Sequence, residues 1–65
     1  MPKLLLERRE VEELTGLSCA SIYRLMRLKR FPEPLKISER AVRWKAAEIE
    51  AWIESRPRAT GEAAA

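Results

Sequence analysis

The sequence predicts a mainly α-helical domain that carries one small β-hairpin. Three observations predict it. Apolar residues repeat at helical spacing on both sides of Gly16. Pro32 and Pro34 force an extended path and exclude a helix there. Apolar and basic residues then alternate with period two before a last helical stretch. With 65 residues, the chain has room for one domain with a modest core.

The N-terminal segment predicts an extended stretch followed by a helix. Residues 2–6 include Leu4, Leu5 and Leu6 and are expected to form a short strand or an extended arm. Arg8–Thr15 should form the first helix, with Val11 and Leu14 facing the core at i, i+3 spacing. Gly16 should end this helix, because it has the backbone freedom that a turn needs. Three acidic side chains should face water: Glu10, Glu12 and Glu13.

A second helix is expected from Cys19 to Leu28 or Lys29, with Ser18 capping its first free amides. Its buried stripe, at i, i+3, i+4 spacing, contains Ile22, Leu25 and Met26. The opposite arc contains Ala20, Tyr23, Arg24 and Arg27. A helix that follows a glycine turn and presents a small residue first and arginines later is typical of the second helix of a helix-turn-helix.

The C-terminal half predicts a hairpin and a third helix. Leu35–Ile37 and Val42–Trp44 should be the two arms of the hairpin. Lys36 and Arg43 should face outward, and the core-facing side should carry Leu35, Ile37, Val42 and Trp44. Ala46–Ser55 should form the third helix, with a buried stripe of Ile49, Trp52 and Ile53. The complete order, helix, turn, helix, hairpin, helix, predicts a winged helix-turn-helix over residues 1–56. Residues 57–65 are expected to be a disordered tail.

The composition excludes several classes of protein. One cysteine and no histidine rule out an internal disulfide, a Cys/His zinc site and a Ser-His-Asp or Cys-His pair. We therefore expect no catalytic residues, metal, cofactor or small-molecule ligand, and no enzyme activity. No apolar run is long enough to span a membrane or to form a signal peptide. A single cysteine fits a reducing cytoplasm, so we expect a cytoplasmic protein.

Positive charge is concentrated in the middle of the chain. Residues 18–45 carry eight basic and two acidic residues, a net charge of +6. Residues 1–17 have a net charge of −1 and residues 46–65 a net charge of −2. This distribution favours a polyanionic partner, with an ordinary solvated surface as the alternative.

Five segments carry a resemblance to a known family: VEELTGLS (11–18), SIYRL (21–25), RFPEPLK (30–36), AVRW (41–44) and EIEAWI (48–53). In these segments the chain resembles the small AlpA-type and excisionase-type DNA-binding proteins of phages and mobile elements. The resemblance covers about Leu5 to Ser55 and implies a MerR-like winged helix. Two positions depart from the family pattern. Ser38-Glu39-Arg40 replaces the usual wing glycine, and Cys19 stands where a polar or basic residue is common.

Candidate DNA contacts on the second helix are Ser18, Ala20, Ser21, Tyr23, Arg24 and Arg27. Arg24 and Arg27 could each pair bidentately with guanine, with phosphate contact or solvation as the alternatives. Ala20 could meet a thymine methyl. Tyr23 could donate to a phosphate or lie along the edge of the core. Ser18 and Ser21 could hold a phosphate in the first turn, although capping alone explains Ser18.

Candidate contacts to the DNA backbone and through the wing are Lys29, Arg30, Lys36, Arg40 and Arg43. Lys36 and Arg43 could neutralise phosphates, and Arg40 could enter the minor groove, whereas a solvated hairpin is the alternative. Cys19 is expected to be small and groove-facing or partly packed, with redox sensing as the alternative. Core packing is expected for both tryptophans, instead of stacking on single-stranded nucleic acid.

The predicted function is sequence-specific binding of double-stranded DNA, as a transcriptional regulator or an excisionase of a phage or mobile element. No long C-terminal coiled-coil helix is present, so we expect binding as a monomer or as neighbouring copies on repeated sites. A recombinase is a further expected partner. The alternative is an adaptor that uses the acidic faces of the first and third helices to recruit a recombinase, polymerase or terminase.

Overall fold

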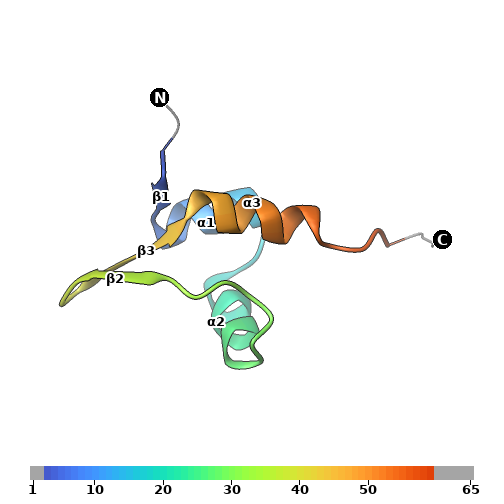
Figure 1. Cartoon of the computed structure of the whole chain (residues 1–65). Coiled ribbons are helices and arrows are strands. Elements are labelled where there is room, and N and C mark those ends of the chain that lie inside the picture. The colour runs from blue at the N-terminus through green and yellow to red at the C-terminus, as the bar shows by residue number, and fades with distance from the viewer. Residues whose placement is uncertain (1–2, 60–65) are drawn as a thin grey trace.

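The computed structural model describes residues 3–59 and confirms a mainly α-helical winged helix-turn-helix with a small antiparallel sheet (Figure 1). Its elements, in chain order, are β1 (Leu5–Leu6), α1 (Arg8–Thr15), α2 (Cys19–Arg27), β2 (Leu35–Ser38), β3 (Ala41–Lys45) and α3 (Ala46–Glu54). The extent of the first helix was predicted correctly. The second and third helices end slightly earlier than predicted, at Arg27 and Glu54.

The three strands are joined by β3, which lies in the middle of the order β1-β3-β2. β1 pairs with the C-terminal end of β3, where Leu6 lies opposite Trp44. β2 pairs with the earlier part of β3 and forms the predicted hairpin. In Figure 1 this hairpin extends to one side, away from the three helices. The wing is therefore attached to the core at one end only.

The core takes one main residue from each of several elements. Val11 of α1, Ile22 of α2, Trp44 of β3 and Ile49 of α3 are fully buried. Leu6 and Phe31 complete the cluster, and Leu25, Met26 and Trp52 pack against it. Because each helix inserts one fully buried side chain, the three helices share a single core. Full burial of an aliphatic side chain contributes about 1.5–3 kcal/mol.

The predicted inner faces of α1 and α3 are wider than the observed ones. Leu14 is 56% exposed and Ile53 is 38% exposed, so both expectations of burial were wrong. Helices of eight or nine residues make only about two turns, and one turn of each meets the small core. Glu12 does not simply face water either. It is half-buried, and its carboxylate pairs with Arg8 Nε at 2.9 Å.

The predicted faces of the hairpin were also wrong. Leu35 pairs with Arg43, and Lys36 pairs with Val42. Residues directly opposite each other share a face, so Lys36 and Arg43 project from opposite faces. Of the four residues expected to face the core, only Trp44 is buried. The others, which lie beyond the reach of the core, are exposed: Leu35, Ile37 and Val42.

The hairpin turn forms without a left-handed residue. Among the described residues, only Gly16 and Lys29 have a positive φ, so the Glu39-Arg40 turn is not one of the primed types that fit a strand's twist. The pairing instead has an irregularity between Lys36 and Ser38. Such a bulge changes the local twist and bends the strand, which explains how two strands can close here without glycine.

The start of α1 is held by charges. The Glu10 carboxylate accepts a hydrogen bond from the Glu7 amide at 2.8 Å and another from the Lys3 ammonium at 2.7 Å. The bond from Lys3, followed by the bond from the Glu7 backbone, lowers the pKa of Glu10 below its ordinary value of 4.5. Ionised Glu10 therefore stabilises the fold above that pH, and the contribution is lost as the pH falls.

The ends of the first two helices differ in their chemistry. α1 ends at Gly16, which has φ 75° and donates its N–H to Glu12 at 2.7 Å. α2 ends in a Schellman motif, in which Arg30 N–H bonds to Leu25 and Lys29 N–H bonds to Met26. Lys29 has φ 61°, so a side chain occupies the left-handed position that usually belongs to glycine.

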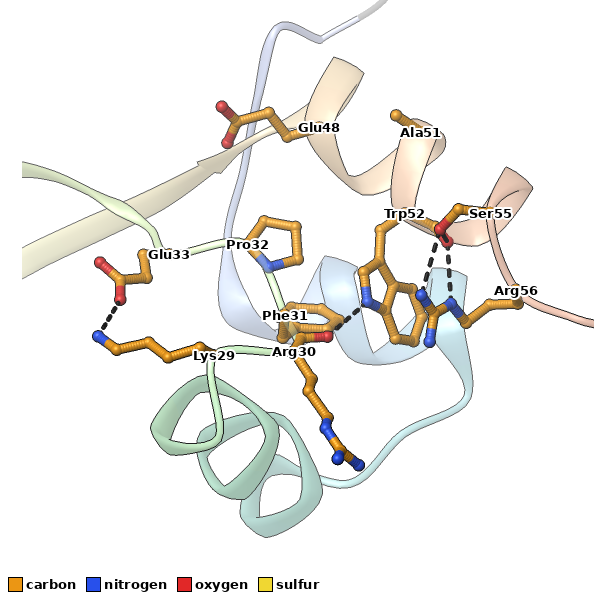
Figure 2. A pocket seen from close by; sticks show the side chains of 10 residues that line it. All are labelled: Lys29, Arg30, Phe31, Pro32, Glu33, Glu48, Ala51, Trp52, Ser55 and Arg56. Carbon is orange, nitrogen blue, oxygen red and sulfur yellow. Dashed lines mark hydrogen bonds and ion pairs between the residues drawn. The ribbon is translucent and has the colours of Figure 1, made fainter.

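The linker between α2 and β2 is fixed by both tryptophans. Trp44 Nε1 donates to the Pro32 carbonyl at 2.9 Å, and Trp52 Nε1 donates to the Arg30 carbonyl at 2.8 Å. Phe31 lies between these carbonyls and meets Trp52 edge to face at 4.8 Å. Figure 2 shows the Trp52 bond and the Arg56 guanidinium beside the same ring, 4.4 Å from its centroid. We call these two indole hydrogen bonds, from Trp44 and Trp52, the tryptophan clamp.

Replacing Lys29 with glycine should stabilise the fold. A side chain in the left-handed region costs roughly 1–2 kcal/mol, of which the greater entropy of glycine in the unfolded chain offsets part. We expect Lys29→Gly to raise the free energy of unfolding by about 0.5–1 kcal/mol. Urea denaturation would measure it. Lys29→Ala is the control, because it removes the same exposed charge but keeps the strain. A gain shared by both variants would contradict the strain argument.

Candidate nucleic-acid interface

The predicted contact arc of α2 is exposed along its length. Ala20, Tyr23, Arg24 and Arg27 point away from the core, while Ile22 on the other side is fully buried. Among residues 3–59, neither Arg24 nor Arg27 has an ion-pair partner. Both guanidiniums are therefore solvated and available to an anionic or hydrogen-bonding ligand.

The two serine hydroxyls in the first turn of α2 form hydrogen bonds within that turn. Ser18 Oγ accepts a hydrogen bond from the Ser21 amide at 3.1 Å and donates one to Ser21 Oγ, also at 3.1 Å. The capping role expected of Ser18 is thus present. Cys19, half-buried beside it, is a free thiol. The turn fixes where α2 begins and consequently which residues lie on its exposed arc.

A groove adjoins this arc between the start of α1, α2 and the wing. Its volume is about 380 Å³. Its lining residues belong to α1, α2 and β3, or directly precede α1 or β3. They are Glu7, Arg8, Arg9, Tyr23, Arg40, Val42 and Arg43. Four arginines face one acid in this list, so the groove is strongly positive. The structure thus brings Tyr23, Arg40 and Arg43 together as one surface.

Two of the four arginines in this groove already have acidic partners. Arg8 is paired with Glu12 along α1 at 2.9 Å. Arg43 lies 4.0 Å from the Glu7 carboxylate and also donates to its neighbouring Val42 carbonyl at 2.8 Å. Arg9 and Arg40 form no ion pair within the described part of the chain. The positive charges of Arg9 and Arg40 are therefore not neutralised by an acid of the described chain.

Sequence reasoning missed Arg8 and Arg9 as members of this surface. They belong to residues 1–17, whose net charge is −1 because four acidic residues outnumber three basic ones. A count of charge along the chain therefore did not indicate a positive surface there. The available signal was their position, since two arginines in the first helical turn oppose the helix dipole. Such an unfavourable placement suggests a use other than support of the helix.

Three of the five predicted backbone and wing contacts lie outside the groove. Lys36 projects from the wing face opposite to Arg43, as the strand register requires. Lys29 and Arg30 line another hollow, between the linker and α3 (Figure 2). There Lys29 pairs with Glu33 at 3.2 Å. Lys29 and Arg30 thus follow the C-terminal end of α2, and Lys36 lies on the wing.

Residues 3–59 contain no cluster of three side chains suited to hold a metal ion. The same residues include no helix with the length and apolar character needed to cross a membrane.

Comparison with known proteins identifies the family of this chain. The family model described as Prophage CP4-57 regulatory protein (AlpA) matches residues 4–57, nearly all of the described chain. The chain belongs to the AlpA family. The matched range contains α1, α2, the wing and α3, so this AlpA-family chain carries the whole helical core and the exposed arc within the family region.

A phage protein is also similar to this AlpA-family chain. It is described as "Uncharacterized protein ORF88" of Enterobacteria phage P4 and is 38% identical over 47 residues. The aligned region is 72% of this chain and 53% of the relative. The chain thus spans about half the length of this curated relative.

The Tyr23 hydroxyl should be dispensable for folding. It makes no hydrogen bond to another group within residues 3–59, and the side chain is 37% exposed. We expect Tyr23→Phe to change the free energy of unfolding by less than about 0.5 kcal/mol, measured by thermal or urea denaturation. A loss above 1 kcal/mol would mean that the hydroxyl supports the fold and is not free for a ligand.

Proposed function

We propose that this AlpA-family chain binds double-stranded DNA as a regulatory protein of a phage or mobile element. The observation that carries the proposal is the exposed arc of α2. It carries two arginines that form no ion pair within residues 3–59, and Tyr23 of the same arc lines the positive groove. A recognition helix enters the major groove with its exposed side chains on the base edges. The regulatory description of the family supports the same assignment. Because that description concerns regulators, an enzymatic role is not proposed.

Arg24 and Arg27 are the proposed sequence-reading residues. A guanidinium can bond bidentately to guanine, which contributes roughly 1–3 kcal/mol of discrimination per good pair. Ala20, one turn earlier, lets the helix approach closely and offers its methyl to thymine. Ser18 and Ser21 are placed at the helix start, where a backbone phosphate can lie.

The wing and the ends of α2 are the proposed backbone contacts. Arg43 and Arg40 would meet phosphates or the minor groove next to the arc, and Lys36 would act from the other wing face. Lys29 and Arg30 would contact phosphates past the end of α2. Contacts of this kind position a protein on DNA and do not by themselves select a sequence.

Excisionase activity is the finer form of the same proposal, because an excisionase also binds and bends duplex sites. Its partners would be a recombinase or neighbouring copies of this chain on repeated sites. We expect a monomer in the absence of DNA, located in the cytoplasm at the nucleoid. The adaptor alternative uses the acidic faces of α1 and α3 and requires no DNA affinity.

Duplex binding should depend steeply on salt. Each neutralised phosphate contributes about −0.9 to the slope of log affinity against log salt. We expect a slope of roughly −3.5 to −5.5, as four to six of the proposed cations each meet a phosphate. Fluorescence anisotropy with a labelled duplex at several salt concentrations would measure it. Absence of duplex binding at low salt would favour the adaptor.

Arg24→Ala and Lys36→Ala should affect binding differently. Loss of Arg24 should relax specificity at one or two base pairs, at a cost of roughly 1–3 kcal/mol on the selected site. Loss of Lys36 should weaken binding to all duplexes about equally and reduce the salt slope by about 1. Competition between a selected site and a scrambled duplex would separate the two effects. If Arg24→Ala bound both with wild-type affinity, the assignment of α2 would be wrong.

A further inference from the structure

We propose that the groove between α1 and the wing is the seat of one DNA backbone phosphate, which Arg9 helps to bind and for which Glu7 substitutes in the free protein. The inference rests on the proposed binding of duplex DNA and adds two residues of α1 and its cap to it. Neither residue lies on the recognition helix or on the wing.

The charges of the groove favour an anion. Its lining contains Arg8, Arg9, Arg40 and Arg43 against Glu7 alone. Glu12, outside the lining, already neutralises Arg8 at 2.9 Å. Arg9 and Arg40 have no acidic partner in residues 3–59. Arginine presents several N–H donors in a planar fork that suits phosphate oxygens, so two such side chains at one groove are suited to a single phosphate.

The location of the groove matches the path of a DNA strand. Tyr23 is on the exposed arc of α2 and also lines the groove. A duplex whose major groove contains that arc places a phosphate strand beside it, toward the wing. The Tyr23 hydroxyl makes no hydrogen bond within the described residues, so it is free to donate to a phosphate oxygen.

Glu7 acts differently in the free protein and in the DNA-bound protein. Its carboxylate lies 4.0 Å from Arg43 Nη2, a distance that gives a weak pair easily exchanged for a phosphate. Both side chains are more than a third exposed, so solvent screens the pair. Without DNA, Glu7 offsets part of the positive charge of Arg43 at the groove. With DNA, the same carboxylate lies close to a phosphate and opposes binding.

The test uses two matched pairs of variants in anisotropy titrations of a selected duplex and a scrambled one. Arg9→Gln should weaken binding to both duplexes equally and reduce the salt slope by about 1. Its control is Arg58→Gln, which removes an exposed arginine beyond α3. Arg9→Lys should recover most of the affinity and the slope. Glu7→Gln should tighten binding to both duplexes about two- to fivefold, as expected for an exposed charge pair.

Glu13→Gln is the control for Glu7→Gln, since Glu13 is exposed on α1 and does not line the groove. Thermal unfolding of every variant would separate loss of fold from loss of contact. This inference alone would be overturned if the wild-type chain binds DNA but Arg9→Gln has the same effect as Arg58→Gln. It would also be overturned if Glu7→Gln has the same effect as Glu13→Gln. A wild-type chain that binds no duplex would overturn the proposed function and this inference with it.

Discussion

The tryptophan clamp is the interaction on which the rest of the fold depends. Trp44 belongs to the wing and Trp52 to α3, yet both donate to carbonyls of the linker that follows α2. This linker contains two prolines, which have no N–H and cannot pair with a strand or helix. The Arg30 and Pro32 carbonyls flank the buried Phe31 in the sequence. Both take side-chain donors, in an exposed bond at Arg30 and a half-buried bond at Pro32. The two indoles provide them.

The clamp determines the geometry of the proposed interface. α2 ends at the Schellman motif and enters the linker at once, so a fixed linker fixes the end of α2. The same linker leads into β2, whose partner β3 carries Arg43. The exposed arc of α2 and the positive groove therefore keep one mutual arrangement. Arg56 covers the outer face of Trp52 and shields that half of the clamp.

Local chemistry made much of the fold predictable from the sequence. Ser18, Gly16 and the two prolines mark the boundaries of elements through capping, positive φ and missing donors, and these effects act within a few residues. Burial of Ile22 and Ile49 followed from helical spacing in the same way. The faces of the hairpin were not predictable, because the irregularity between Lys36 and Ser38 shifts the alternation that the pattern implies.

The candidate site was predictable only in part. The exposed arc of α2 follows from the spacing of one helix, so Tyr23, Arg24 and Arg27 could be chosen from the sequence. The groove instead combines residues from α1, α2 and the wing, and no sequence spacing relates Arg9 to Arg40. Exposure of Leu14 and Ile53 likewise depends on how far the small core extends, which local periodicity does not reveal.

The most direct test of the central claim is a titration of the ¹⁵N-labelled chain with duplex DNA, followed by amide and indole chemical shifts. The account predicts the largest changes at Tyr23–Arg27, Arg9 and Arg40–Arg43, with the Trp44 and Trp52 indole signals retained because the tryptophan clamp stays closed. Changes confined to the outer face of α3, around Glu50 and Glu54, with Tyr23–Arg27 unaffected, would contradict it.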